Sequence, residues 1–115
     1  MSLYSWNKIP KEKLNEKLER KFISGSKVMI AQVFLKKGCV VPAHSHESEQ
    51  ITYILSGSMV MKLPDKEVTL GEGDVLVIPS RVEHSAVAVE ETLDVDVFSP
   101  IREDWIKGTD SYLRK

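Results

Sequence analysis

The chain has 115 residues, of which 42% are hydrophobic and 29% are charged, as in an ordinary globular domain. Its 16 basic and 17 acidic side chains give a formal net charge of -1, so we expect neither nucleic acid nor an anionic membrane as a partner. No apolar run approaches the roughly 20 residues of a membrane-spanning helix, and no signal-peptide pattern opens the chain. With a single cysteine, Cys39, these features predict a cytoplasmic protein that folds as one domain over residues 1–115.

The first segment of the chain combines an arm with a charged, periodic run. Residues 1–10 read as an N-terminal arm that stops at Pro10. In residues 11–21, Leu14 and Leu18 are four apart among helix-favouring charged side chains, and Phe22 continues the spacing. Helix propensity alone therefore predicts a short helix over 11–21. Because its acids and bases alternate, we interpret the run as a solvated face.

From Phe22 onward the pattern is that of β-strands separated by turns rich in glycine, proline and aspartate. The predicted strands span residues 27–35, 50–55, 59–63, 67–70, 75–78, 85–89 and 93–98. Many short strands at a spacing of roughly 8–12 residues are typical of an all-β sandwich or barrel. Pro100 ends the last strand, and residues 101–113 are predicted to form a short helical or irregular tail.

All three histidines of the chain lie in two strand-like blocks that begin at a glycine. His44 and His46 are two residues apart, so both imidazoles leave one face of a regular strand, and Gln50 keeps the same parity. His84 follows a second block that begins at Gly73. A lone histidine would be interpreted as a hydrogen-bonded or solvent-facing ring. Since neutral imidazole is the commonest metal ligand, the combination of three predicts a metal site.

Gln50 has two possible roles in such a site. It is either a fourth ligand, which adds an oxygen donor without a negative charge, or an inward hydrogen-bonding residue behind three histidines. Three imidazoles and one amide would leave a divalent ion with its full charge, which suits polarisation of hydroxyl and carboxylate oxygens. The ligand types admit zinc, nickel, iron, manganese or copper, and the sequence does not choose among them.

The last predicted strand, residues 93–98, alternates strictly between two kinds of side chain. Asp94, Asp96 and Phe98 share one face, and the aliphatic residues between them share the other. A generic edge strand would place both carboxylates in solvent, but a phenylalanine among aspartates favours the mouth of a pocket. Asp96 is therefore a candidate for proton transfer, because a pocket can raise a carboxylate's pKa toward the working range.

Two arginines are candidates for binding a carboxylate, which guanidinium groups bind bidentately. Arg102 follows the last strand closely and can fold back over the rim of the pocket. The plainer interpretation of Arg102 is a surface residue paired with Glu103 or Asp104. Arg81 lies on the loop before His84 and is the second candidate for the same role.

The two glycine-bounded blocks resemble the two motifs of the cupin superfamily. The first motif, G-x5-H-x-H-x3-E-x6-G, matches at Gly38, His44, His46 and Gly57, and the second, G-x5-P-x-G-x2-H-x3-N, matches at Gly73, Pro79 and His84. The chain departs from the motifs at Gln50, Arg81 and Ala88, where they have glutamate, glycine and asparagine. The resemblance covers about residues 27–98. It implies a double-stranded β-helix, or jelly-roll barrel, with a short N-terminal arm and a C-terminal tail.

Three runs, at residues 49–57, 73–79 and 96–105, are similar to the KdgF family of pectin-degradation proteins. Members of that family bind a metal through three histidines and a glutamine, which implies one divalent ion held by His44, His46, Gln50 and His84. The resemblance also implies functional roles for Asp96, Phe98 and Arg102. The implied activity converts cyclic 4,5-unsaturated uronate monomers, from pectin or alginate breakdown, to the linear 4-deoxy-5-keto uronate.

The same resemblance implies a small-molecule substrate, a sugar acid, and a homodimer, since small cupins commonly pair through their outer sheets and terminal arms. Two other functions use the same three histidines. An iron-dependent cupin dioxygenase would consume oxygen only when iron is bound. A non-catalytic cupin that binds a metal or a sugar would show saturable binding without product.

Overall fold

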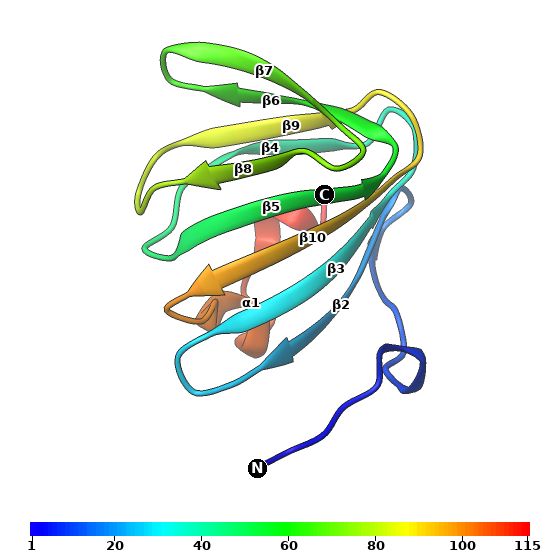
Figure 1. The fold of residues 1–115 in the computed structure, drawn as a ribbon, viewed down its shortest axis with the longest axis vertical. Helices are drawn as coiled ribbons and strands as arrows, with labels where there is room; N and C mark the ends of the chain where they lie inside the picture. The colour runs from blue at the N-terminus through cyan, green and yellow to red at the C-terminus, as the bar shows by residue number, and fades with distance from the viewer.

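The computed structural model describes residues 1–115 as two antiparallel sheets, which enclose the interior of the molecule (Figure 1). The larger sheet has the strand order β1-β2-β3-β10-β5-β8, and the smaller has the order β4-β9-β6-β7. The strands are β1 (Glu12–Asn15), β2 (Leu18–Ser24), β3 (Met29–Leu35), β4 (Val40–His44), β5 (Glu49–Ser56), β6 (Ser58–Leu63), β7 (Lys66–Gly71), β8 (Val75–Ile78), β9 (His84–Ala88) and β10 (Thr92–Ser99). The helical segments are η1 (Trp6–Lys8), α1 (Glu103–Lys107) and η2 (Ser111–Leu113). This is the all-β, double-stranded β-helix architecture that the sequence predicts.

The inner face of the larger sheet is a grid of side chains, because antiparallel pairing sets partners beside one another on the same face. Three rows cross β5, β10, β3 and β2; they are Gln50-Phe98-Met29-Ser24, Thr52-Asp96-Ala31-Phe22 and Ile54-Asp94-Val33-Arg20. Met29, Ala31 and Ile54 are fully buried, as expected of a core. Five polar members of the grid are buried as well: Gln50, Thr52, Asp94, Asp96 and Arg20. Buried polar side chains need polar partners, so the grid marks where a site can lie.

The hydrophobic core continues onto the smaller sheet. Met59 and Met61 of β6 are buried there among Ala86, Ala88 and Leu70. Both methionines therefore act as core-filling side chains. Cys39, just before β4, is buried in the same cluster.

The helix predicted over residues 11–21 is wrong, because this segment forms β1 and the start of β2. Asn15 closes the tight turn between the two strands, where its side-chain oxygen accepts a hydrogen bond from Lys17 N at 2.9 Å. The β2 strand then pairs with β3 over its whole length, from Leu18 to Ser24. Leu18, Arg20 and Phe22 thus face inward with the period of a strand. Tertiary pairing has overridden the helix propensity of the charged side chains.

The C-terminal tail is short and helical, as predicted, and it covers the opening between the two sheets. Trp105 of α1 packs edge-on against Phe98 and Phe22 of the larger sheet, with ring centroids 5.0 and 6.0 Å apart. Tyr112 of η2 stacks on His44 of the smaller sheet at 4.4 Å. The tail is therefore part of the wall of the interior. Neither α1 nor any other helix has the length and apolarity that crossing a membrane requires.

Candidate functional site

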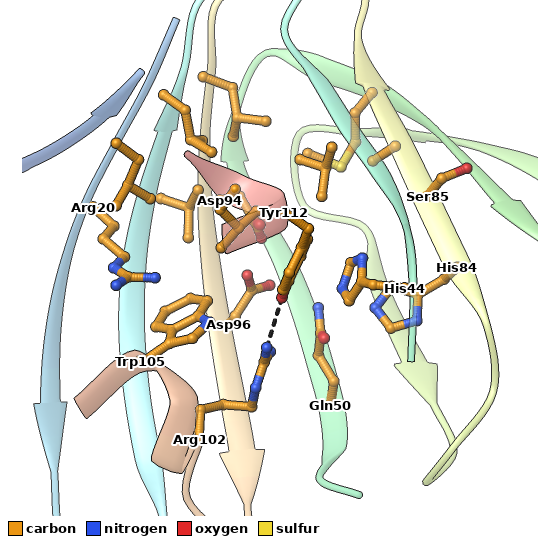
Figure 2. Close-up of a pocket in the computed structure, with 18 of the residues that line it drawn as sticks. Arg20, His44, Gln50, His84, Ser85, Asp94, Asp96, Arg102, Trp105 and Tyr112 are labelled. Carbon is orange, nitrogen blue, oxygen red and sulfur yellow. Dashed lines mark hydrogen bonds between the residues drawn. The ribbon is translucent and has the colours of Figure 1, made fainter. Parts of the chain in front are cut away.

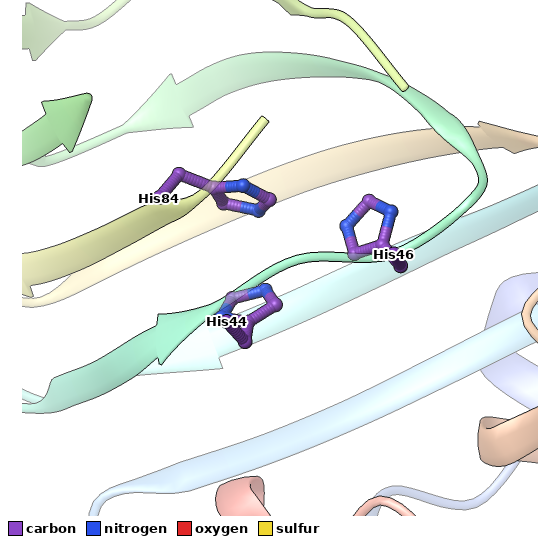
Figure 3. A group of neighbouring side chains, drawn as sticks. All are labelled: His44, His46 and His84. Carbon is purple, nitrogen blue, oxygen red and sulfur yellow. The ribbon is translucent and has the colours of Figure 1, made fainter. Parts of the chain in front are cut away.

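Three histidines converge at one end of the interior, one from each of two strands and one from a loop (Figure 3). His44 ends β4 and is paired directly with His84, the first residue of β9. His46 lies in the loop after β4, where the chain crosses to β5 of the other sheet. One ring nitrogen of each histidine lies within 4.8 Å of those of the other two. The structure thus brings together the three predicted rings, although a loop positions His46 and not the regular strand that the parity argument assumed.

Each ring is held by a hydrogen bond from its Nδ1 to a backbone carbonyl. The bonds run from His44 to Pro42 at 2.8 Å, from His46 to Ser48 at 2.9 Å and from His84 to Val82 at 2.9 Å. Because a carbonyl only accepts, Nδ1 carries the hydrogen in each ring and Nε2 presents its lone pair. Carbonyl bonds of this kind orient histidines that bind metals.

Gln50 is directed at the same point. Its Nε2 donates to Thr52 Oγ1 at 2.8 Å, which turns its Oε1 toward His46 Nε2, 3.0 Å away. Both facing atoms present lone pairs, and a cation bound by both would satisfy them. Two ligand atoms that each lie about 2.1 Å from one metal ion, with a right angle between their bonds to it, are about 3.0 Å apart. The separation of His46 Nε2 and Gln50 Oε1 fits this arrangement. The Nε2 of His84, buried and without a protein partner, also fits a metal ion.

The histidines are in the neutral form that binds metals. Burial lowers the pKa of His44 and His46 to about 4 and is the largest cause for both. Burial also lowers the pKa of His84, and the positive charge of Arg102 adds to the lowering in all three rings. At neutral pH none of these rings needs to lose a proton before it binds a cation.

The histidine cluster opens into a cavity that extends between the sheets (Figure 2). Its wall is largely hydrophobic, with Leu18, Val33 and Met59 among its residues. The predicted residues Asp96, Phe98 and Arg102 all line it. An apolar cavity with a few convergent polar groups is the usual form of a small-molecule site.

Asp96 lies inside the cavity and is connected to Gln50 through Thr52. Thr52 Oγ1 accepts from the amide of Gln50 and donates to Asp96 Oδ1 at 2.9 Å. Burial raises the pKa of Asp96, although hydrogen bonds with Asp94 and Thr52 and the charge of Arg102 act in the opposite direction. Asp94, one row further along β10, has its pKa raised first by burial and then by the charge of Asp96. Two neighbouring carboxyl groups in an apolar wall favour retention of a proton.

Arg102 both lines the cavity and pairs with Asp104. Its Nε and Nη2 donate to Asp104 at 3.0 and 2.9 Å, as in the surface interpretation, yet its side chain is only 3% exposed. Nη2 also donates to the hydroxyl of Tyr112 at 2.6 Å (Figure 2). The side chain of Arg81, in contrast, is 74% exposed, and its Nη2 lies 3.6 Å from Glu47 Oε1. Arg81 does not line the cavity.

The cavity residues that were not singled out from the sequence include Arg20, Trp105 and Tyr112. Trp105 and Tyr112 are aromatic residues in a tail rich in polar side chains, a signal that could have placed this tail over an apolar opening. Arg20 lies between Leu18 and Phe22 on β2, where a charged residue reads as solvent-facing. Only the alternation of a strand would place Arg20 on the inward face with Leu18 and Phe22, and this segment was predicted to be a helix.

The comparisons with known proteins agree with this fold. The sequence profile of the cupin domain matches residues 31–99, so the chain belongs to the cupin family. The chain is similar to KdgF from Halomonas sp., with 30% identity and a TM-score of 0.84 over 90% of this chain and 99% of that one. No curated protein sequence matches it.

Two further solved structures show the likeness of the fold alone. An RmlC-like cupin from Shewanella frigidimarina is 24% identical, with a TM-score of 0.85 over 91% of this chain and 96% of that one. Oxalate decarboxylase from Bacillus subtilis, which has Mn(II) centres, is 21% identical, with a TM-score of 0.79 over 88% of this chain and 30% of that one.

Proposed function

We propose that the protein is a metal-dependent cupin enzyme that converts cyclic 4,5-unsaturated uronate monomers to linear 4-deoxy-5-keto uronate. One observation carries the proposal: His44 and His84 of the histidine cluster line the same cavity as Asp96 and Arg102. The 30% identity to KdgF supports it, since residues 96–105 match the family run that implies this activity. The substrate class is therefore a sugar acid.

His44, His46, Gln50 and His84 would hold one divalent transition metal ion, with zinc, nickel, iron, manganese and copper all compatible. When bound, such an ion would polarise the substrate's hydroxyl or carboxylate oxygens. The Nδ1 bonds to backbone carbonyls keep the rings in place whether or not substrate is present. The apolar wall excludes water from the reacting atoms.

Arg102 and Asp96 would act on the substrate directly. Arg102 would bind the carboxylate, and Asp104 and Tyr112 hold its guanidinium in position. The product is an isomer of the substrate: the bond between C1 and the ring oxygen breaks, the C1 hydroxyl loses its proton, and C4 gains one as the enol becomes a ketone. Asp96 would deliver the proton to C4, a role that its raised pKa suits.

We infer further that the protein is a homodimer in the cytoplasm. The outer face of the larger sheet carries an apolar patch formed by Ile30, Ile51, Tyr53, Val75 and Val77. The register sets these side chains in adjacent rows, Val77-Ile51 next to Val75-Tyr53, with Val97 and Val95 beside them. A contiguous apolar sheet face pairs well with a second copy of itself. The single buried Cys39 suits a reducing compartment.

The test is a time course of ultraviolet absorbance with a 4,5-unsaturated galacturonate monomer, whose conjugated double bond is lost on conversion. Metal-loaded protein should accelerate the loss of absorbance over the spontaneous rate, and removal of the metal by a chelator should abolish the acceleration. No acceleration by metal-loaded protein would contradict the proposal. The oxygen electrode and ligand titration would then test the dioxygenase and binding-module alternatives.

A further inference from the structure

The unsatisfied polar atoms of the protein are concentrated in one place. Four buried side-chain atoms lack a hydrogen-bond partner: Arg20 Nη2, His84 Nε2, Asp94 Oδ1 and Trp105 Nε1. All four residues line one cavity, which His44 also lines (Figure 2). Buried polar groups in folded proteins are nearly always paired, so this concentration indicates a ligand. The metal accounts for His84, but the proposed chemistry does not use Arg20 or Asp94.

Arg20 and Asp94 lie together, across the larger sheet from the histidines. Both are paired with Val33, so they flank it in one inward-facing row of β2, β3 and β10. Gln50 is on β5, three strands from Arg20, which corresponds to about 14 Å between the two strands. In Figure 2, Arg20 and His44 lie on opposite sides of the cavity. A monosaccharide bound at the metal would extend toward Arg20 and Asp94.

Arg20 offers a fixed hydrogen-bond donor whose charge is already compensated. Its Nη1 forms an ion pair with buried Asp110, and its Nε donates to Glu12 at 3.0 Å. Arg114 binds the same two acids, so the four charges balance. The guanidinium also stacks on Trp105 at 4.2 Å, which restricts its orientation. A compensated donor of this kind suits a neutral hydroxyl oxygen better than a second carboxylate.

Asp94 supplies the complementary acceptor. Its side chain is buried, no ion pair joins it to Arg20, and its Oδ1 has no partner. A hydroxyl group both accepts and donates a hydrogen bond, so a donor on one side and an acceptor on the other match it. Leaving such a pair unsatisfied costs free energy that a bound hydroxyl would recover.

We propose that Arg20 and Asp94 form a hydroxyl-binding subsite, which holds the hydroxyl-bearing end of a sugar acid whose other end is at the metal centre. The identity of the ligand as a sugar acid rests on the proposed function. The subsite selects for hydroxyl groups through a hydrogen bond from Arg20 and one to Asp94. Its loss should therefore weaken binding of hydroxylated ligands specifically.

The test compares two carboxylates of similar size by calorimetric titration of the metal-loaded protein. Galacturonate carries hydroxyl groups, and cyclohexanecarboxylate does not. The wild type should bind galacturonate at least about tenfold more tightly, the value of one well-placed hydrogen bond to a charged group. Asp94→Leu removes the acceptor and fits the apolar wall, so it should lower only the affinity for galacturonate, again by about tenfold.

Arg20→Lys is the second variant, because it keeps a positive charge for Asp110 but lacks the Nη2 donor. Its matched control is Arg114→Lys, which alters the same ion-pair network without reaching the cavity. We expect Arg20→Lys, but not Arg114→Lys, to reduce the preference for galacturonate. If Asp94→Leu does not fold, Arg20→Lys decides the question.

A wild type that binds both carboxylates equally, or folded variants that keep the full preference, would overturn the subsite. The outcome is separable from that of the proposed reaction. Hydroxyl selectivity that depends on Asp94 would stand even if no unsaturated uronate were converted. Conversion by a protein without that selectivity would leave the reaction standing and remove the subsite.

Discussion

At the scale of single residues, the site depends on which atom of each side chain is already hydrogen-bonded within the protein. Backbone carbonyls occupy the Nδ1 atoms of the three histidines, and Thr52 occupies the amide nitrogen of Gln50. The atoms that remain, three Nε2 and one Oε1, all present lone pairs toward one region. The cluster fits a cation because each side chain has one atom that is hydrogen-bonded to the protein and another whose lone pair is available.

Asp96 gives the sharpest prediction at this scale. In Asp96→Asn the amide oxygen can still accept from Thr52, so the hydrogen-bonded link to Gln50 and the metal end should persist. The amide cannot transfer a proton, however, and we expect turnover to fall by about 10²–10⁴-fold. Absorbance assays give the rate, and elemental analysis of the same sample gives the metal content, which should not change.

The control for that variant is Asp65→Asn, which removes a carboxylate from the exposed turn between β6 and β7. It should leave both turnover and metal content at wild-type values. Full activity in Asp96→Asn would show that this carboxyl group is not the proton donor. Loss of metal along with activity would instead give Asp96 a structural role at the metal end.

Sequence spacing could indicate candidate site residues only where they lie close together in the chain. His44, His46 and Gln50 lie within seven residues, so their spacing groups them even though a loop positions His46. Asp96 and Phe98 share a strand face, so strand parity groups those two. Arg20 could not be found in this way, because its partners Asp110 and Trp105 are about 90 residues away in the chain. An arginine between apolar residues carries no sign that a tail will cover it.

At the scale of elements, the β1–β2 hairpin shows the limit of local propensity. Its sequence favours a helix, but β2 is paired with β3 along its entire length, which places Leu18 in the core and Arg20 at the cavity. Hydrogen-bond pairing and burial outweigh propensities that amount to tenths of a kcal/mol per residue. Most strands after Phe22 were predicted because propensity, alternation and glycine turns agree there, but β4, Val40–His44, was not among the predicted strands.

The turn between β5 and β6 gives the prediction at this scale. Gly57 has a φ of +91°, and a Cβ there would lie 2.3 Å from Glu91 O and 2.5 Å from Thr92 Oγ1. Gly73 has a similar φ of +88°, but a Cβ there would meet nothing within 4 Å. Gly73→Ala should therefore cost only the conformational strain, about 1–2 kcal/mol of the free energy of unfolding. Gly57→Ala should cost on the order of 2 kcal/mol more, because β10 must move.

Urea unfolding of the two variants measures this difference. Thr92 begins β10 and binds Ser58 O at 3.0 Å, so the turn helps to set the register that places Asp96 beside Thr52. Gly57→Ala should consequently reduce activity as well as stability. Equal stability losses in the two variants would mean that the close approach at Gly57 is not a constraint on the fold.

At the scale of the whole molecule, the cavity has walls from both sheets and from the C-terminal tail. β2, β5 and β10 supply Arg20, Gln50 and Asp96, whereas β4 and β9 supply His44 and His84. Alternation in the sequence predicts which side chains of one strand share a face, but not which strands face each other. The cupin motifs provided that information, and the match over residues 31–99 confirms the family and fold.

The apolar patch on the larger sheet predicts the state of association. Light scattering should give about twice the 13.0 kDa mass of the chain for the wild type. Ile51→Lys puts a charge in the centre of the patch and should give monomers, because burying an unpaired lysine is costly. Val87→Lys, at an exposed valine of the smaller sheet, is the control and should remain dimeric. A monomeric wild type, or a dimeric Ile51→Lys, would contradict pairing through this face.

The most direct test of the account is the number of metal ions bound per chain. Purified protein, loaded with zinc and dialysed against metal-free buffer near neutral pH, should retain one ion per chain by elemental analysis. His84→Ala removes one of the three converging Nε2 atoms and should lose most of that metal, while substitution of the exposed Arg81 should not. A wild type that retains no metal, or an alanine variant that retains as much as the wild type, would contradict the metal centre on which the proposed function depends.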